Sequence, residues 1–236
     1  MTSIRIGSFV FRLLLFGLVL LVFESISHCG SNPVDSGNSK NEILPLAVGN
    51  KWVYFALSTY GAIDTVTTEV LSSTVIDTGK GRVKAYGVNY RFNEEPIPDF
   101  QWIYWNCPDG LVGAGGISSR DTLIVKSLML KYPGVVGDSL LVPNVSYSDG
   151  QFYVKDTLTH FLVSTDDSIT TPFGTFTGCY VYNYKESQGE DVAGFDDIFD
   201  YYVPGIGLVG EIVRTLIWNV PRDTTYRLLL SSYSIR

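Results

Sequence analysis

Few side chains in this sequence have the types and spacing that catalysis needs. The 236 residues include three cysteines and two histidines, and His160 is the only histidine that follows Cys29. His160 lies in a strand-like run, so we predict a surface or hydrogen-bonded strand histidine rather than a general base. The chain has no G-x-S-x-G, H-E-x-x-H or C-x-x-C motif, the signatures of serine hydrolases, zinc peptidases and dithiol sites. We expect no cofactor and no metal, and we favour a protein without catalytic activity.

The segment before Cys29 predicts export. Arg5 and Arg12 form a basic start, and Leu13–Phe23 is an unbroken apolar run of eleven residues. A membrane-spanning helix needs roughly 20 apolar residues. A run of this length is instead typical of the central region of a signal peptide.

The residues around Cys29 resemble a lipobox, the recognition site of bacterial lipoprotein signal peptidase. Ile26 is aliphatic and Ser27 is small, as that site requires, whereas His28 stands where Gly, Ala or Ser is usual. Residues 30–39 are small, polar and turn-rich, which is typical of a flexible tether. We predict a signal peptide at 1–28, cleavage before Cys29, lipid (palmitate included) on that cysteine, and a tether at 29–43. The alternative is an ordinary secretory signal with a cysteine nearby.

The charge of the chain limits which kinds of partner it can bind. The net charge is -7, and 15 basic and 23 acidic residues remain after Cys29. An acidic chain argues against nucleic acid as a partner and against electrostatic adhesion to anionic lipid. Attachment to a membrane would therefore come from the lipid on Cys29. No Asp follows the cysteine directly, which by resemblance to enterobacterial sorting favours the outer membrane, facing the periplasm.

Two cysteines remain once Cys29 is lipidated. Cys107 and Cys179 are a candidate disulfide, because an oxidising compartment favours pairing of an even number of cysteines. Cys179 also begins an alternating strand pattern, so it could instead be a small buried apolar residue. The sequence leaves both readings open.

Carboxylates gather between residues 186 and 200. The run contains Glu186, Glu190, Asp191, Asp196, Asp197 and Asp200. Its spacing matches no calcium loop, although carboxylate oxygens are calcium ligands. We predict a solvated acidic loop, with a metal site or a contact for a basic partner as alternatives.

The rest of the chain predicts an all-β domain at 44–236. Aromatic residues make up 14% of the chain, and short β-rich runs alternate with Gly, Asn, Asp and Pro. We predict a mainly antiparallel, strongly curved sheet, as a half-barrel or a sandwich. The predicted strands are Lys51–Thr59, Asp64–Ile76, Arg82–Tyr90, Gln101–Trp105, Thr122–Leu130, Phe152–Val163, Ser168–Thr171, Cys179–Glu186, Asp200–Val203, Leu208–Ile217 and Thr225–Ser234.

A short pattern occurs twice. Both Pro45–Asn50 and Pro133–Asp138 read P-x-x-V-G-[N/D], and each precedes a β-rich segment. Pro opens a turn, Gly permits a positive φ, and Asn or Asp hydrogen-bonds the backbone. A common turn type explains the pattern, and two similar halves of one sheet are the alternative.

Two motifs in the second half carry a family resemblance. Thr171–Tyr180 reads T-P-F-G-T-F-T-G-C-Y, and Tyr201–Glu211 reads Y-Y-V-P-G-I-G-L-V-G-E. The chain resembles uncharacterised bacterial envelope proteins of a TapB-like family over roughly Leu44–Ile217. The resemblance implies a curved antiparallel sheet akin to the open half-barrels of lipoprotein carriers, and it implies no catalytic residues.

Aromatic side chains give the clearest indication of binding. Alternation along a strand places Trp102 and Tyr104 on one face, and likewise Tyr180, Tyr182 and Tyr184. Core packing is the favoured reading, because Tyr and Trp fill sandwich cores. The alternative is a surface for an apolar ligand.

These observations favour a non-enzymatic, membrane-anchored envelope lipoprotein that binds an apolar ligand, such as a lipid, or an assembly partner through an aromatic sheet face. The alternative is a glycan-acting hydrolase that uses a pair of carboxylates.

Overall fold

The predicted all-β architecture is confirmed. The computed structural model describes residues 42–58, 61, 63–93, 99–187, 194–217, 220–221 and 226–236. The predicted signal peptide, Cys29 and most of the tether lie outside these residues. The strands are β1 (Lys51–Ser58), β2 (Ile63–Asp77), β3 (Arg82–Phe92), β4 (Phe100–Cys107), β5 (Gly110–Ser118), β6 (Thr122–Lys131), β7 (Ser139–Ser148), β8 (Gln151–Thr171), β9 (Gly174–Ser187), β10 (Gly194–Val203), β11 (Gly207–Ile217), β12 (Val220–Pro221) and β13 (Tyr226–Ser234).

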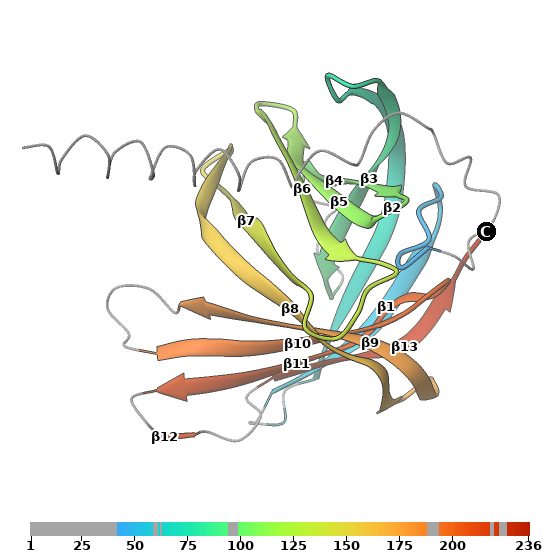
Figure 1. Ribbon diagram of the computed structural model, residues 1–236, viewed down its shortest axis with the longest axis vertical. Helices are drawn as coiled ribbons and strands as arrows, with labels where there is room; N and C mark the ends of the chain where they lie inside the picture. Colours follow the sequence, from blue (N-terminus) through green and yellow to red (C-terminus); the bar gives the residue numbers. More distant parts are fainter. Residues whose placement is uncertain are drawn as a thin grey trace, which may run out of the picture.

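The strands form one antiparallel sheet that curves until it nearly closes. Its order is β6-β5-β4-β3-β2-β1-β13-β11-β10-β9-β8-β7, with the short β12 beside β11. In Figure 1, β9, β10 and β11 run side by side, while β2 to β6 rise away from them. Of the two predicted arrangements, the half-barrel is therefore correct. The described residues contain no helix long and apolar enough to cross a membrane.

The sheet consists of two meanders joined through β1 and β13. The first meander is β1 to β6, and the second runs from β7 to β13. The edge strands β6 and β7 lie beside each other, and the Ser127 hydroxyl of β6 donates to the Leu141 carbonyl of β7 across 3.3 Å. We call this line of contact the seam.

The first copy of the repeated pattern forms a turn that joins β1 to the middle of β2. Gly49 has a φ of 92°, and the Asn50 amide donates to the Ala47 carbonyl. The Gly49 amide then donates to the Val70 carbonyl, and the Val70 amide donates to the Asn50 carbonyl.

The second copy makes the same bonds at the start of the second meander. Gly137 has a φ of 97°, and the Asp138 amide donates to the Val135 carbonyl. The Gly137 amide donates to the Leu162 carbonyl, and the Leu162 amide donates to the Asp138 carbonyl. The two patterns thus occupy equivalent positions in two similar halves.

Two groups of buried side chains form the core. The larger group includes Trp52, Tyr54 and Tyr182. The smaller group includes Ile103 and Trp105 of β4. Because neighbouring residues of a strand face opposite sides, Trp102 and Tyr104 point away from this smaller group, as the alternation predicted.

Candidate functional site

A cavity opens at the seam of the sheet. Its volume is about 210 Å³, and its walls come from six strands, β4 to β9. Val125 and Met129 of β6 and Val142 and Val145 of β7 are among the residues that line it. Both halves of the molecule therefore build this cavity, and most of its wall is apolar.

Glycines in β5 shape the cavity wall. A Cβ on Gly113 would lie 2.3 Å from the Met129 sulfur, so the Met129 side chain lies directly over this glycine. Gly115 has a φ of 94°, and the pairing of β5 with β6 shifts register between Gly113 and Gly115. A register shift of this kind bends a strand locally, here beside the cavity.

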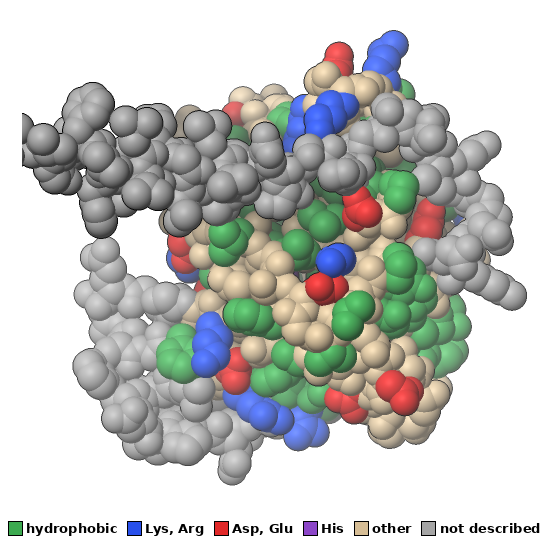
Figure 2. Space-filling model, viewed as in Figure 1, with side chains coloured by type: hydrophobic (Ala, Val, Ile, Leu, Met, Phe, Trp, Pro, Cys, Tyr) green, Lys and Arg blue, Asp and Glu red, His purple; other side chains and the backbone are tan. Residues whose placement is uncertain are grey.

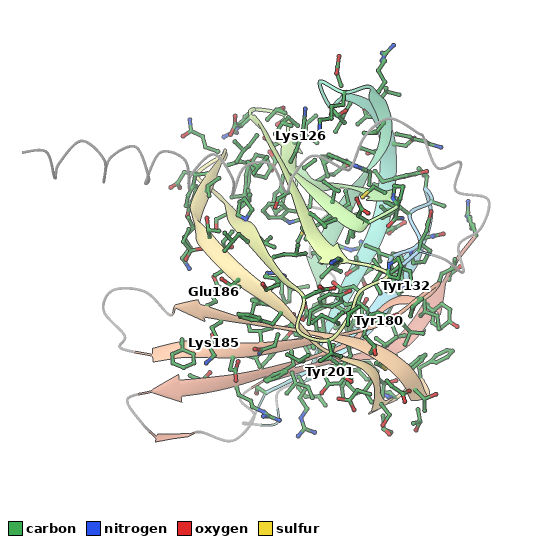
Figure 3. The ribbon with its side chains drawn as sticks, viewed as in Figure 1. Lys126, Tyr132, Tyr180, Lys185, Glu186 and Tyr201 are labelled. Atoms are coloured by element: carbon green, nitrogen blue, oxygen red, sulfur yellow. The ribbon has the colours of Figure 1, made fainter. Side chains whose placement is uncertain are left out.

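The predicted aromatic face divides into two groups. Trp102, Tyr104 and Tyr184 line the cavity. Tyr182 is instead buried in the core, where its hydroxyl donates to the Lys131 carbonyl. Tyr180 packs edge-on against Tyr132, with ring centroids 5.1 Å apart. Figure 3 shows this Tyr132–Tyr180 contact well away from Glu186, which is at the end of β9.

His160 lies in the cavity wall, stacked on Tyr184. The two rings are 4.4 Å apart and inclined by 11°. Burial lowers the pKa of His160 to about 4, and a hydrogen bond to the Met129 backbone opposes this shift. The imidazole is therefore neutral at pH 7, and its Nδ1 has no hydrogen-bond partner. The predicted hydrogen-bonded strand histidine therefore makes a hydrogen bond at only one of its two ring nitrogens.

Glu186, which lines the cavity, is bonded to two further polar side chains. The Lys155 ammonium lies 3.0 Å from Glu186 Oε1, and the Asn144 amide donates to the same oxygen. Asp156 stands opposite Asn144 in the β7–β8 register and shares a strand face with Leu158 and His160. Its Oδ1 is buried and has no hydrogen-bond partner.

A second group of polar side chains lies deeper inside the sheet. Asp200 of β10 stands opposite Glu211 of β11. Burial, the nearby charge of Glu211 and a hydrogen bond between the two side chains raise the pKa of Asp200 well above its usual value. Burial also raises the pKa of Glu211, to about 7. The site therefore favours the protonated form of Asp200, whose carboxyl group donates a hydrogen bond to Glu211.

This carboxyl pair does not have the geometry of a glycosidase. A retaining enzyme needs carboxyl groups about 5 Å apart, and an inverting enzyme needs a wider gap. Asp200 and Glu211 are hydrogen-bonded to each other, so a sugar cannot lie between them. Tyrosines surround the pair instead. Burial and the nearby charge of Asp200 raise the pKa values of Tyr54, Tyr184 and Tyr202.

The predicted solvated acidic loop is wrong at Asp200, which is only 8% exposed. Asp196 and Asp197 lie on the same strand, where they accept hydrogen bonds from Thr215 and Asn183. Glu190 and Asp191 lie outside the described residues. Within the described part of the chain, no three His, Cys, Asp or Glu residues are grouped as a metal site.

The predicted disulfide between Cys107 and Cys179 is also wrong. Cys179 is a free and fully buried thiol, and burial raises its pKa to about 11. Its side chain packs in the larger core group, whereas Cys107 packs against the smaller one. The alternative reading, a small buried apolar residue, is correct for Cys179.

Comparison with known proteins identifies the fold. A comparison with protein-family models gave no match, and neither did a comparison with curated proteins. A crystal structure from Bacteroides fragilis, provisionally described as an exported protein with a YmcC-like fold, has a TM-score of 0.50 and 13% identity, covering 81% of this chain and 98% of its own. A crystal structure from Parabacteroides distasonis, provisionally described as a lipoprotein, has a TM-score of 0.49 and 15% identity, covering 84% and 100%.

Proposed function

We propose that this protein is a non-enzymatic lipoprotein of the cell envelope that holds an apolar ligand in the cavity at the seam. Lipid on Cys29 anchors it to the outer membrane, and the sheet faces the periplasm. The motifs at 171–180 and 201–211 group it with the TapB-like envelope proteins. The observation that carries the proposal is the cavity, because aromatic and aliphatic side chains from six strands line it.

The proposed location in the cell envelope rests on the sequence and on one protein with a similar fold. The apolar run before Cys29, the lipobox-like residues and the tether all favour export and lipidation. The Bacteroides fragilis protein with the similar fold is itself described as exported. On the face drawn in Figure 2, acidic and basic side chains are interspersed, so that face offers no basic surface that would hold a membrane by charge.

A ligand would remain bound through the same burial that stabilises the core. Burial of apolar surface contributes roughly 25 cal/mol per Å², and small-molecule sites are typically concave, largely apolar and equipped with a few polar groups. The cavity has this composition, with Ser127, Asn144, His160 and Glu186 as its polar members.

Filling the cavity is expected to abolish ligand retention. Leu158 lines the cavity, so a Leu158→Trp variant would occupy the space that the ligand needs. Native mass spectrometry of protein purified from its own membrane should show a non-covalent mass in the wild type and none in this variant. Val163→Trp is the matched control, because Val163 lies on the same strand and is 42% exposed. Wild-type protein without a retained mass, or retention in Leu158→Trp, would contradict the proposal.

A further inference from the structure

We propose that the end of the half-barrel at which β1 and β7 begin docks onto the lipid bilayer that holds Cys29. Four exposed apolar side chains in the turns at this end, Val48, Val135, Val136 and Phe173, would lie in the membrane interface. We call these residues the tether end. This inference rests on the proposed lipid anchor, and it adds the orientation of the domain on the membrane.

The two copies of the repeated turn lie at the same end of the half-barrel. Every strand pairing among the described residues is antiparallel, and β1 and β7 stand six places apart in the strand order. Strands an even number of places apart run in the same direction, so the turns that precede β1 and β7 share one end. β9 stands two places from β7, which brings the β8–β9 turn to this end as well. The C-terminus lies here too, because Ser234 pairs with Lys51 at the start of β1, and Figure 1 marks it at the right of the view.

The apolar side chains of the tether end are unusually exposed for their type. Val48 and Val136 occupy the same position in the two copies of P-x-x-V-G-[N/D], and they are 46% and 56% exposed. Val135 is 72% exposed and Phe173, in the β8–β9 turn, is 50% exposed. Pro, Gly and Asn or Asp of the pattern serve the backbone of the turn, whereas an exposed valine does not. A single exposed valine needs no explanation, but its recurrence at the same position of both halves indicates an apolar partner.

The chain that comes from the anchor enters the domain at this end. The Glu42 carbonyl accepts a hydrogen bond from the Gly205 amide in the turn between β10 and β11. Twelve residues separate Cys29 from Glu42, and a chain spans at most about 3.5 Å per residue. Glu42 therefore lies within about 45 Å of the lipidated cysteine. A tether of this length keeps the bilayer at high effective concentration near the tether end.

The charges beside the exposed turns do not oppose contact with a bilayer. Asp138, at the end of the second turn, is paired with Lys131 across 3.0 Å. The Arg236 side chain lies beside the first turn, because a Cβ on Gly49 would be 3.0 Å from its Cζ. Such a side chain can lie along apolar surface and keep its charge at the level of the lipid headgroups. Because the four apolar side chains stand on three separate turns, an extended surface suits them better than a small ligand does.

Fluorescent labels at single cysteines test this orientation. Lipidated full-length protein with Cys107→Ser would carry Val48→Cys or Val136→Cys, each labelled with the environment-sensitive dye NBD. The control is Val154→Cys, because Val154 is 45% exposed and lies near the start of β8, at the opposite end. Each protein would be reconstituted in phosphatidylethanolamine–phosphatidylglycerol vesicles with and without doxyl-labelled lipid. We expect the doxyl lipid to quench at least half of the fluorescence of the labels in the two turns, and less than a tenth of the fluorescence of the control.

Three results would overturn the inference. Equal quenching at all three positions would show that the domain has no preferred orientation. Quenching of the turn labels by aqueous iodide, and not by doxyl lipid, would leave this end free for a protein partner. The parent without an added cysteine should take up no dye, because Cys29 carries lipid and Cys179 is buried. Dye on Cys29 would instead show that the proposed anchor itself fails, and the inference with it.

Discussion

Replacing Glu211 by glutamine is expected to raise the free energy of unfolding by about 3 kcal/mol near neutral pH and to leave it almost unchanged near pH 4. Burial raises the pKa of this carboxyl from 4.5 to about 7 in the folded protein, against the opposing effect of the hydrogen bond from Asp200. In the unfolded chain the same carboxyl ionises near its ordinary value.

The direction of this stability change depends on whether the folded or the unfolded protein keeps the proton on Glu211. The stability from the protonated carboxyl is present in full below about pH 4.5, and it is lost as the pH rises towards 7. Glutamine has no proton to lose and can still accept the hydrogen bond from Asp200. The variant therefore keeps the stability that the wild type loses.

His160 titrates in the opposite direction over nearly the same range. Burial lowers its folded pKa from 6.5 to about 4, so its contribution is present above 6.5 and lost as the pH falls through 4. The pH dependence of wild-type stability alone would not separate the two effects, because they act in opposite directions. Urea unfolding of the wild type and Glu211→Gln across this pH range isolates Glu211, because His160 is common to both proteins.

Asp166→Asn serves as the control for losing one carboxylate, since Asp166 is exposed. A difference between Glu211→Gln and wild type that stays constant with pH would show that Glu211 is not perturbed in this way. So would a variant that is less stable than wild type at about pH 8.

Replacing Gly115 by alanine is expected to cost about 3 kcal/mol or more of stability. The φ of Gly115 is 94°, a conformation that disfavours any side chain. The added Cβ would also lie 2.1 Å from the Leu123 carbonyl oxygen. That oxygen belongs to the backbone of β6, so the β5–β6 pairing must distort, and the cavity wall with it.

Gly79→Ala provides a matched comparison. Gly79 also has a positive φ, of 77°, but a Cβ there would meet nothing within 4 Å. We expect this variant to lose about 1 kcal/mol, from the backbone conformation alone. Urea unfolding of both variants at one pH measures the difference, which reports the contact with Leu123. Equal losses in the two variants would contradict a steric role for Gly115.

The sequence predicted most strands but missed β5, β7 and the two-residue β12, and the structure gives a physical reason for the first two. β5 contains four glycines in nine residues, a composition that disfavours strands unless neighbouring side chains fill the space, as Met129 does over Gly113. β7 contains Pro143, which lacks the amide that a central strand needs. Pro143 is tolerated because β7 is an edge strand.

The cavity could be predicted only in part. Alternation correctly put Trp102 and Tyr104 on one face, and both line the cavity. The same rule grouped Tyr182 with Tyr184, but the curvature of the sheet carries Tyr182 into the core. Asp200 looked like part of an acidic loop, because pairing with Glu211 depends on strand register. The contribution of β6, β7 and β8 depends on how the two edges meet, which no local pattern encodes.

The chemical state of the Cys29 sulfur decides whether this protein is lipid-anchored. Cys179 is buried and free, so a Cys29 that escaped lipidation would have Cys107 as its natural disulfide partner. A lipidated sulfur is a thioether and cannot form that bond. Intact mass analysis of protein from its own membrane, with and without reductant and alkylating agent, separates the two cases. We predict a chain that begins at Cys29, carries covalent lipid and gives no alkylation at Cys29 after reduction. A lipid-free chain whose Cys29 becomes alkylated only after reduction would show that the protein is not lipid-anchored.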